Sequence, residues 1–146
     1  MYIKPKSYEE ICREFGGEIK NNVCWVNGYP MDNARYLFNY KPQSQRHVTM
    51  RPEEFLSLVP MSPGVIDKRV LEELKRKIKE GVPLDPLFLD VDVETGEVKN
   101  HEGRHRALAC DEVATCEKVP VILYYRNEEY RYVDITGKKV LQPIKR

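Results

Sequence analysis

The chain of 146 residues is long enough for one domain with a hydrophobic core and too short for two comfortable ones, since 41% of its residues are hydrophobic. Its 24 Lys and Arg residues offset 23 Asp and Glu residues to give a formal net charge of +1, which excludes a basic field over the whole protein. The sequence contains no apolar run long enough to span a bilayer, and its start lacks the apolar core of a secretion signal. These features predict a cytoplasmic protein that does not bind membranes.

Residues 1–46 have the pattern of an accessory segment. Helical patterns cover 8–15 and 32–40, on either side of a strand-like stretch at 18–26, and Asn27-Gly28 is a turn signal. Aromatic residues are interleaved here with Arg35, Lys41 and Arg46; they are Trp25, Tyr29, Tyr36, Phe38 and Tyr40. Such interleaving occurs in proteins that stack single-stranded bases, but packing in the core is the simpler interpretation of the aromatic side chains.

A more regular pattern begins at residue 47. A short strand is expected at 47–50, followed by a helix over 51–59, because Pro52 and two acidic residues occupy its first turn. Apolar residues then recur at helical spacing, which predicts a helix that packs on the core.

The clearest helix signal covers 67–80. Asp67 can cap its start, Gly81 can end it, and its apolar stripe is formed by Val70, Leu71, Leu74 and Ile78. Its opposite face carries i,i+4 pairs of opposite charge, namely Glu72 with Arg76 and Glu73 with Lys77. A solvated helix face accounts for most of these charges, and Arg69 and Lys77 remain candidate phosphate contacts.

Strands alternate with turns in the remaining sequence. Strands are expected at 87–93 and 98–100 around a turn, and a short helix then extends to about Glu112. A nearly continuous apolar strand follows at 119–125, and a hairpin is expected around 134–137.

The four cysteines are Cys12, Cys24, Cys110 and Cys116. No CxxC pair exists, so no zinc-binding spacing is present. Cys110 and Cys116 could approach each other at the end of a helix, but small buried thiols are the expected state in a cytosolic protein.

The most informative stretch is 101–109, with the sequence His-Glu-Gly-Arg-His-Arg-Ala-Leu-Ala. The backbone N–H groups of a first helical turn have no intrahelical partner and lie at the positive end of the helix dipole. Arg104 and Arg106 add positive charge to this turn, so the sequence predicts an anion site suited to phosphate.

In this order of elements, Gly103-Arg104-His105-Arg106-Ala107 resembles the hallmark of the ParB and sulfiredoxin superfamily. The helix ending at Gly81, the strand Pro86-Leu87-Phe88-Leu89 and the strand Val119-Pro120-Val121 fit the same pattern. The resemblance implies an α+β fold: one compact core at 47–126, with a small mixed sheet and flanking helices. An N-terminal α/β extension would precede this core at 1–46, and a hairpin or tail would follow at 127–146.

Proteins with this pattern include DNA-partition proteins that bind and hydrolyse nucleotide, DNA nucleases, a nucleotide-dependent serine kinase and sulfiredoxin. Arg104 stands where sulfiredoxins carry their essential cysteine, so sulfinic acid repair is not expected. The partition branch normally adds a helix-turn-helix domain, for which the roughly twenty residues after Arg126 are too few, so sequence-specific partition binding is not expected either.

The resemblance therefore favours a small nuclease or nucleotide hydrolase dependent on Mg²⁺ or Mn²⁺. Glu102 would hold the metal or orient water, and His105 would carry a proton, although a capping or packing role explains His105 equally well. The expected phosphate or nucleotide contacts, with ATP or ADP as a ligand, are Gly103, Arg104, His105, Arg106, Arg69 and Lys77.

Two other functions stay open: a noncatalytic regulatory module that binds DNA or nucleotide, and a nucleotide-dependent kinase of small molecules. Nucleases with two metals gather several carboxylates, and Asp90 and Asp92 share one strand face but could equally face solvent. DNA or nucleotide would bind through a local basic patch, and a protein partner or a homo-oligomer is also open.

Overall fold

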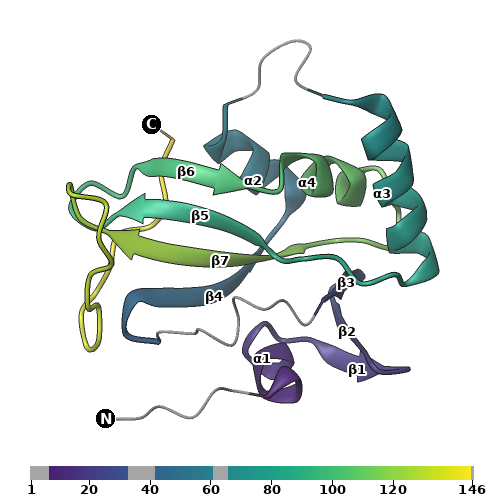
Figure 1. Ribbon diagram of the computed structural model, residues 1–146, viewed down its shortest axis with the longest axis horizontal. Helices are drawn as coiled ribbons and strands as arrows, with labels where there is room; N and C mark the ends of the chain where they lie inside the picture. The colour runs from purple at the N-terminus through teal and green to yellow at the C-terminus, as the bar shows by residue number, and fades with distance from the viewer. Residues whose placement is uncertain (1–6, 33–41, 61–65, 146) are drawn as a thin grey trace.

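The computed structural model describes residues 7–32, 42–60 and 66–145. Within these ranges, four α-helices and two small sheets form a mixed α+β fold, which confirms the predicted class (Figure 1). The helix expected at 32–40 falls almost wholly on residues outside these ranges. In chain order the elements are α1 (Tyr8–Glu14), β1 (Glu18–Lys20), β2 (Val23–Val26), β3 (Tyr29–Met31), a 3-10 turn (Pro42–Ser44), β4 (Gln45–Met50), α2 (Pro52–Leu58), α3 (Lys68–Glu80), β5 (Leu87–Asp92), β6 (Val98–Glu102), α4 (Arg104–Asp111) and β7 (Val119–Arg126).

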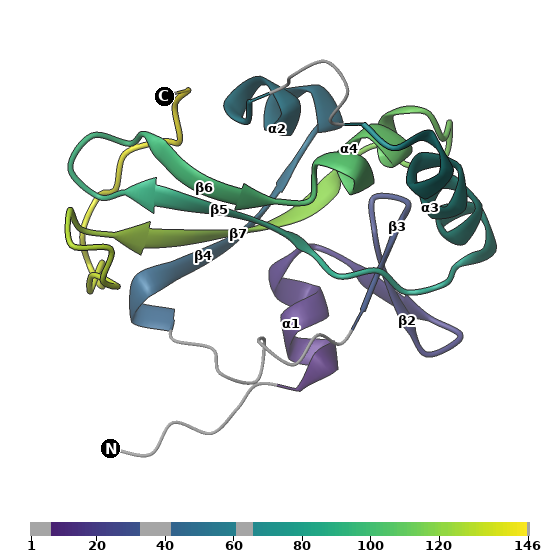
Figure 2. The same ribbon diagram turned by 45° about the horizontal axis from the view of Figure 1, so that its top comes forward.

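The larger sheet has the strand order β4-β7-β5-β6. Strands β5 and β7 are parallel, whereas β4 pairs with β7 and β6 pairs with β5 in antiparallel fashion. Helices α2, α3 and α4 lie on one side of this sheet, and α1 with the smaller sheet lies on the other (Figures 1 and 2). The start of α4 follows directly from β6 on the helix-covered side.

The N-terminal segment forms α1 and an antiparallel sheet of the order β1-β2-β3. The single strand expected at 18–26 is instead two strands joined by Asn21 and Asn22, whose φ angles are 51° and 65°. Two consecutive residues with positive φ make the tight hairpin turn that suits the twist of antiparallel strands, and asparagine tolerates this conformation. Helix α1 docks on the large sheet where Phe15 stacks on His47, with ring centroids 4.6 Å apart.

Helix α3 follows the sequence prediction closely. The Asp67 carboxylate accepts hydrogen bonds from the backbone N–H groups of Arg69 (2.9 Å) and Val70 (3.3 Å). Gly81 ends the helix in the left-handed conformation, with φ 74°. The expected helices at 8–15 and 51–59 are also present, with boundaries shifted by a residue at their ends.

The C-terminal segment 127–145 lacks the expected hairpin. Around Asp134 the chain makes only a turn, in which the Asp134 carboxylate accepts the Thr136 N–H at 2.8 Å. The chain instead reverses directly after β7, where Arg126 and Tyr132 form an isolated antiparallel bridge. The end of the segment then pairs with the start of β6, because the Val98 N–H donates to the Ile144 carbonyl at 3.1 Å.

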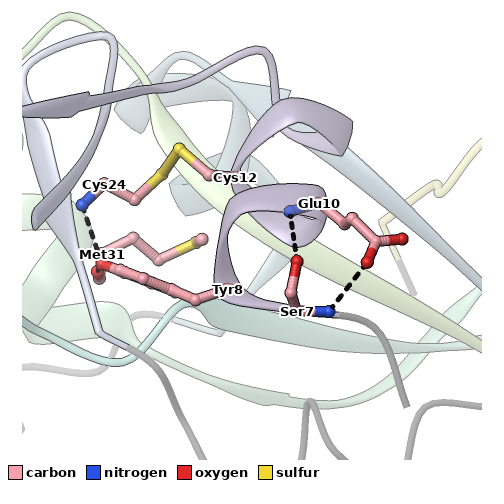
Figure 3. Close-up of a disulfide and its surroundings, with 6 residues drawn as sticks. All are labelled: Ser7, Tyr8, Glu10, Cys12, Cys24 and Met31. Carbon is pink, nitrogen blue, oxygen red and sulfur yellow. Dashed lines mark hydrogen bonds between the residues drawn. A yellow bond between two sulfur atoms is a disulfide. The ribbon is translucent and has the colours of Figure 1, made fainter. Parts of the chain in front are cut away.

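All four cysteines are in disulfides, so the expectation of free buried thiols is wrong. Cys12 of α1 is bonded to Cys24 of β2, next to the capping turn at Ser7 and Glu10 (Figure 3). That expectation assumed a reducing cytoplasm. In the folded chain the two sulfur atoms of each pair are bonded to each other. The second bond, from Cys110 to Cys116, closes the loop between α4 and β7.

Across residues 7–32, 42–60 and 66–145, no helix is both long and apolar enough to cross a membrane.

Candidate anion site at the start of α4

The chain turns from β6 into α4 at Gly103. Its φ angle is 119°, and a Cβ atom built on it would lie 2.3 Å from Cγ of Leu87 in β5. Both the backbone conformation and the lack of space therefore require glycine. This close approach fixes the first turn of α4 against the sheet.

The backbone donors in the first turn of α4 precede the hydrogen bonds of the helix itself. The first intrahelical bond of α4 runs from the Ala107 N–H to the Gly103 carbonyl at 2.9 Å, so the N–H groups of Arg104, His105 and Arg106 precede the helical ladder. Among the described residues no side chain caps this helix, in contrast to α3, where Asp67 provides a carboxylate. No capping carboxylate of the described residues therefore balances the positive end of the α4 dipole, whereas α3 has one.

The starts of α3 and α4 are joined through His105. Its Nε2 accepts a hydrogen bond from the backbone N–H of Asp67 at 3.0 Å. A ring nitrogen that accepts cannot carry a proton, so the proton of this imidazole lies on Nδ1. This contact is the packing role that the sequence left open for His105, and it occupies one of the two ring nitrogens.

Arg106 is bound to the chain that enters β5. Its Nη1 donates to the carbonyl oxygens of Asp85 (2.7 Å) and Pro86 (3.1 Å), and its side chain is only 13% exposed. The fully buried Tyr29 of β3 also donates its hydroxyl to the Asp85 carbonyl, and burial raises the pKa of Tyr29 so that it remains a donor. Arg106 therefore ties α4 to the chain that enters β5, at the same carbonyl oxygen that Tyr29 of the N-terminal segment bonds.

Among the described residues, Arg104 carries a buried donor that lacks an acceptor. Its Nε is buried and has no hydrogen-bond partner within the described residues, while its Nη2 lies 3.5 Å from Nε2 of His101. Burial, followed by the charge of Arg104, lowers the pKa of His101. A buried N–H left without an acceptor is costly, and a bound anion would satisfy it.

Glu102 points toward the opposite side of β6 from His101. Its side chain is 64% exposed, and one oxygen lies 3.6 Å from Nη2 of Arg106. In the described part of the chain no group of three His, Cys, Asp or Glu side chains could hold a metal ion. A Mg²⁺ ion at Glu102 would therefore need the phosphate oxygens of a ligand as further ligands.

Asp90 and Asp92 share a strand face as expected, but both are buried rather than solvent-facing. Asp90 accepts hydrogen bonds from Nε of Arg126 (2.6 Å) and from the hydroxyl of Tyr130 (2.7 Å). The Arg126 guanidinium in turn lies 4.2 Å from the ring centroid of Tyr132. These contacts show that Asp90 holds the end of β7 in place. The sequence did not reveal this role, because the partners of Asp90 lie 36 and 40 positions away.

The two candidate contacts of α3 lie at different ends of that helix. Arg69 is exposed in its first turn, close to Asp67 and hence to the start of α4. Lys77 follows eight positions later, or about 12 Å farther along the helix axis. The structure thus groups Arg69, but not Lys77, with the α4 site.

The charged face of α3 forms other ion pairs than expected. Arg76 pairs with Glu73 and Glu80, and Lys75 pairs with Glu72.

Comparison with known proteins finds no matching family model, no matching curated protein and no matching solved structure.

Proposed function

We propose that this protein binds a phosphate group at the start of α4, on a core that resembles the ParB and sulfiredoxin superfamily. The observation that carries the proposal is the pairing, within the described residues, of an uncapped helix start at Gly103 with the buried, unpartnered Nε of Arg104. The order of elements from β4 to β7 supports the proposed core, because strand, two helices, two strands, helix and strand follow as the resemblance implies.

In this proposal, the residues have separate roles. The backbone N–H groups of the first turn of α4 and the Arg104 side chain bind phosphate oxygens. Gly103 lets the turn form, and His105 holds it against α3 through the Asp67 N–H. Arg106 positions the turn from the inside and adds positive charge at short range.

Binding rather than hydrolysis is the proposed activity. The two expected catalytic side chains are already engaged: Glu102 with Arg106, and Nε2 of His105 with the Asp67 N–H. Release of phosphate from ATP, or cleavage of DNA, in the presence of Mg²⁺ or Mn²⁺ would add hydrolysis to the function, and loss of that activity in Glu102→Ala would assign it to this site.

The proposal is tested by titrating the protein with inorganic phosphate and with ATP by calorimetry. Arg104→Ala is expected to weaken both affinities about tenfold, equivalent to about 1.4 kcal/mol. Arg131→Ala is the matched control, since its side chain is 78% exposed and pairs locally with Glu129. Equal affinities in the two variants would show that phosphate does not bind at Arg104.

A further inference from the structure

A pocket of about 350 Å³ opens beside the α4 site, between the end of α2, strand β6 and the C-terminal segment. Most of its surface is apolar. The described residues that line it are Leu58, Pro60, Val98, Lys99, Asn100, His101 and Lys145. Its volume is at the lower end of the range for small-molecule sites, which is about 300–1,000 Å³.

The C-terminal segment forms one wall of this pocket. It docks on the turn between β5 and β6, where the Ile144 N–H donates to the Gly96 carbonyl at 2.8 Å. Gly96 has a φ of 78°, and a Cβ atom on it would lie 2.8 Å from the Gln142 carbonyl oxygen. Glycine at this position thus lets the segment approach closely enough to bring Lys145 to the pocket.

The pocket is connected to the proposed phosphate site through His101. This residue lines the pocket, and its Nε2 lies 3.5 Å from Nη2 of Arg104. A molecule that fills the pocket and extends past His101 would therefore reach the guanidinium whose Nε has no partner in the described part of the chain.

The charges around the pocket favour an anion. The described lining residues include Lys99 and Lys145, and none of these lining residues is a carboxylate. Lys99 is partly neutralised by Glu97, whose oxygen lies 3.0 Å from its Nζ. Arg104, which contacts His101, adds further positive charge where the pocket meets the α4 site.

We infer that the ligand of the α4 site is a small organic phosphate monoester, with its phosphate at Arg104 and its compact apolar part in this pocket. This inference rests on the proposed phosphate site and adds the class of ligand to it. A nucleic-acid strand fits these observations less well, because its affinity depends on many phosphate contacts along a basic surface, whereas the chain has a net charge of +1 and this pocket holds one small group.

The test compares phenyl phosphate with inorganic phosphate as probes of the full chain. Phenyl phosphate is expected to bind at least about tenfold more tightly, because its ring leaves water for an apolar pocket. Leu58→Trp should fill the pocket and remove this preference while leaving the affinity for inorganic phosphate unchanged. Val82→Trp is the matched control, since it places the same ring on an exposed residue after α3, and it should preserve the preference.

A second measurement does not depend on a variant. Nuclear Overhauser contacts should connect the ring protons of bound phenyl phosphate with methyl groups of Leu58 and Val98, which both line the pocket. Equal affinity for the two probes, or contacts only to residues outside the pocket, would overturn the inference while leaving the phosphate site intact. Tighter binding of a single-stranded oligonucleotide that displaces phenyl phosphate would also overturn it. Absence of binding by every probe would instead overturn the proposed function itself.

Discussion

The backbone N–H of Asp67 donates to Nε2 of His105 over 3.0 Å, and this contact holds the starts of α3 and α4 together. The two helix starts differ in how their own N–H groups are satisfied. In α3 the Asp67 carboxylate accepts them, whereas no side chain of the described residues caps α4. Within the described residues, the start of α3 thus provides its own anion, whereas the neighbouring start of α4 does not.

Loss of the His105 acceptor should loosen this junction. His105→Ala is expected to lower the free energy of unfolding by about 1 kcal/mol, the usual net value of one hydrogen bond. It should weaken phosphate binding less than Arg104→Ala does, because the backbone donors of α4 remain. Chemical denaturation measures the first effect. His105→Gln, whose amide oxygen can accept from the Asp67 N–H, is the control; equal losses for Ala and Gln would show that the hydrogen bond is not what stabilises the junction.

Gly103→Ala should be strongly destabilising. The new methyl group would be placed 2.3 Å from Cγ of Leu87 on a residue with φ 119°, so backbone strain and overpacking combine to about 3 kcal/mol. Gly137→Ala separates these two causes, because Gly137 has φ 69° but no described heavy atom would lie within 4 Å of a Cβ built on it. That control should lose only about 1 kcal/mol. Equal losses in thermal denaturation would contradict the close contact with Leu87.

The two disulfides should contribute unequally to stability. Replacing Cys12 and Cys24 by serine opens a loop with a sequence separation of 12, which predicts a loss of about 3 kcal/mol. The same change at Cys110 and Cys116, with a separation of 6, should cost about 2 kcal/mol. Denaturation of both double variants measures these losses. Four reactive thiols in the unreduced, unfolded wild-type protein would show that neither disulfide forms.

Stability should decrease in mild acid partly through His101. Burial, and then the Arg104 charge, lower the pKa of His101 below its ordinary value of 6.5. The unfolded chain therefore binds the proton more readily, so the contribution of His101 is full above the unfolded pKa and declines as the pH falls from 6.5 to the folded pKa. Denaturation between about pH 5 and pH 8 should show a smaller loss in His101→Gln than in the wild type. Parallel pH profiles would contradict the shift.

Local patterns predicted much of the fold. Helix α3 could be located from Asp67, its apolar stripe and Gly81, because capping and periodicity act within one helix. The turn at Asn21 and Asn22 also had a local signal, two consecutive residues that tolerate positive φ, but the strand pattern on either side obscured it.

The site depends more on contacts between distant residues. The sequence identified Gly103 to Arg106 as a group at a helix start, and the structure places them there. It could not show that Arg106 bonds the carbonyl oxygens of Asp85 and Pro86, or that the Arg104 Nε becomes buried without a partner among the described residues. The Arg106 bonds join positions 21 and 20 residues apart, and periodicity does not encode contacts over such separations.

The most direct test of the phosphate site follows the backbone amide signals of the protein by NMR during a titration with inorganic phosphate. The proposal predicts saturable shifts for the amides of Arg104, His105 and Arg106, with the Nε–H signal of Arg104 moving in parallel, because these donors would bind the phosphate oxygens. Amide signals of Arg69 and Val70 should move little, since the Asp67 carboxylate already accepts their hydrogen bonds. Saturable shifts confined to other residues, or no saturable shift at all, would contradict phosphate binding at the start of α4.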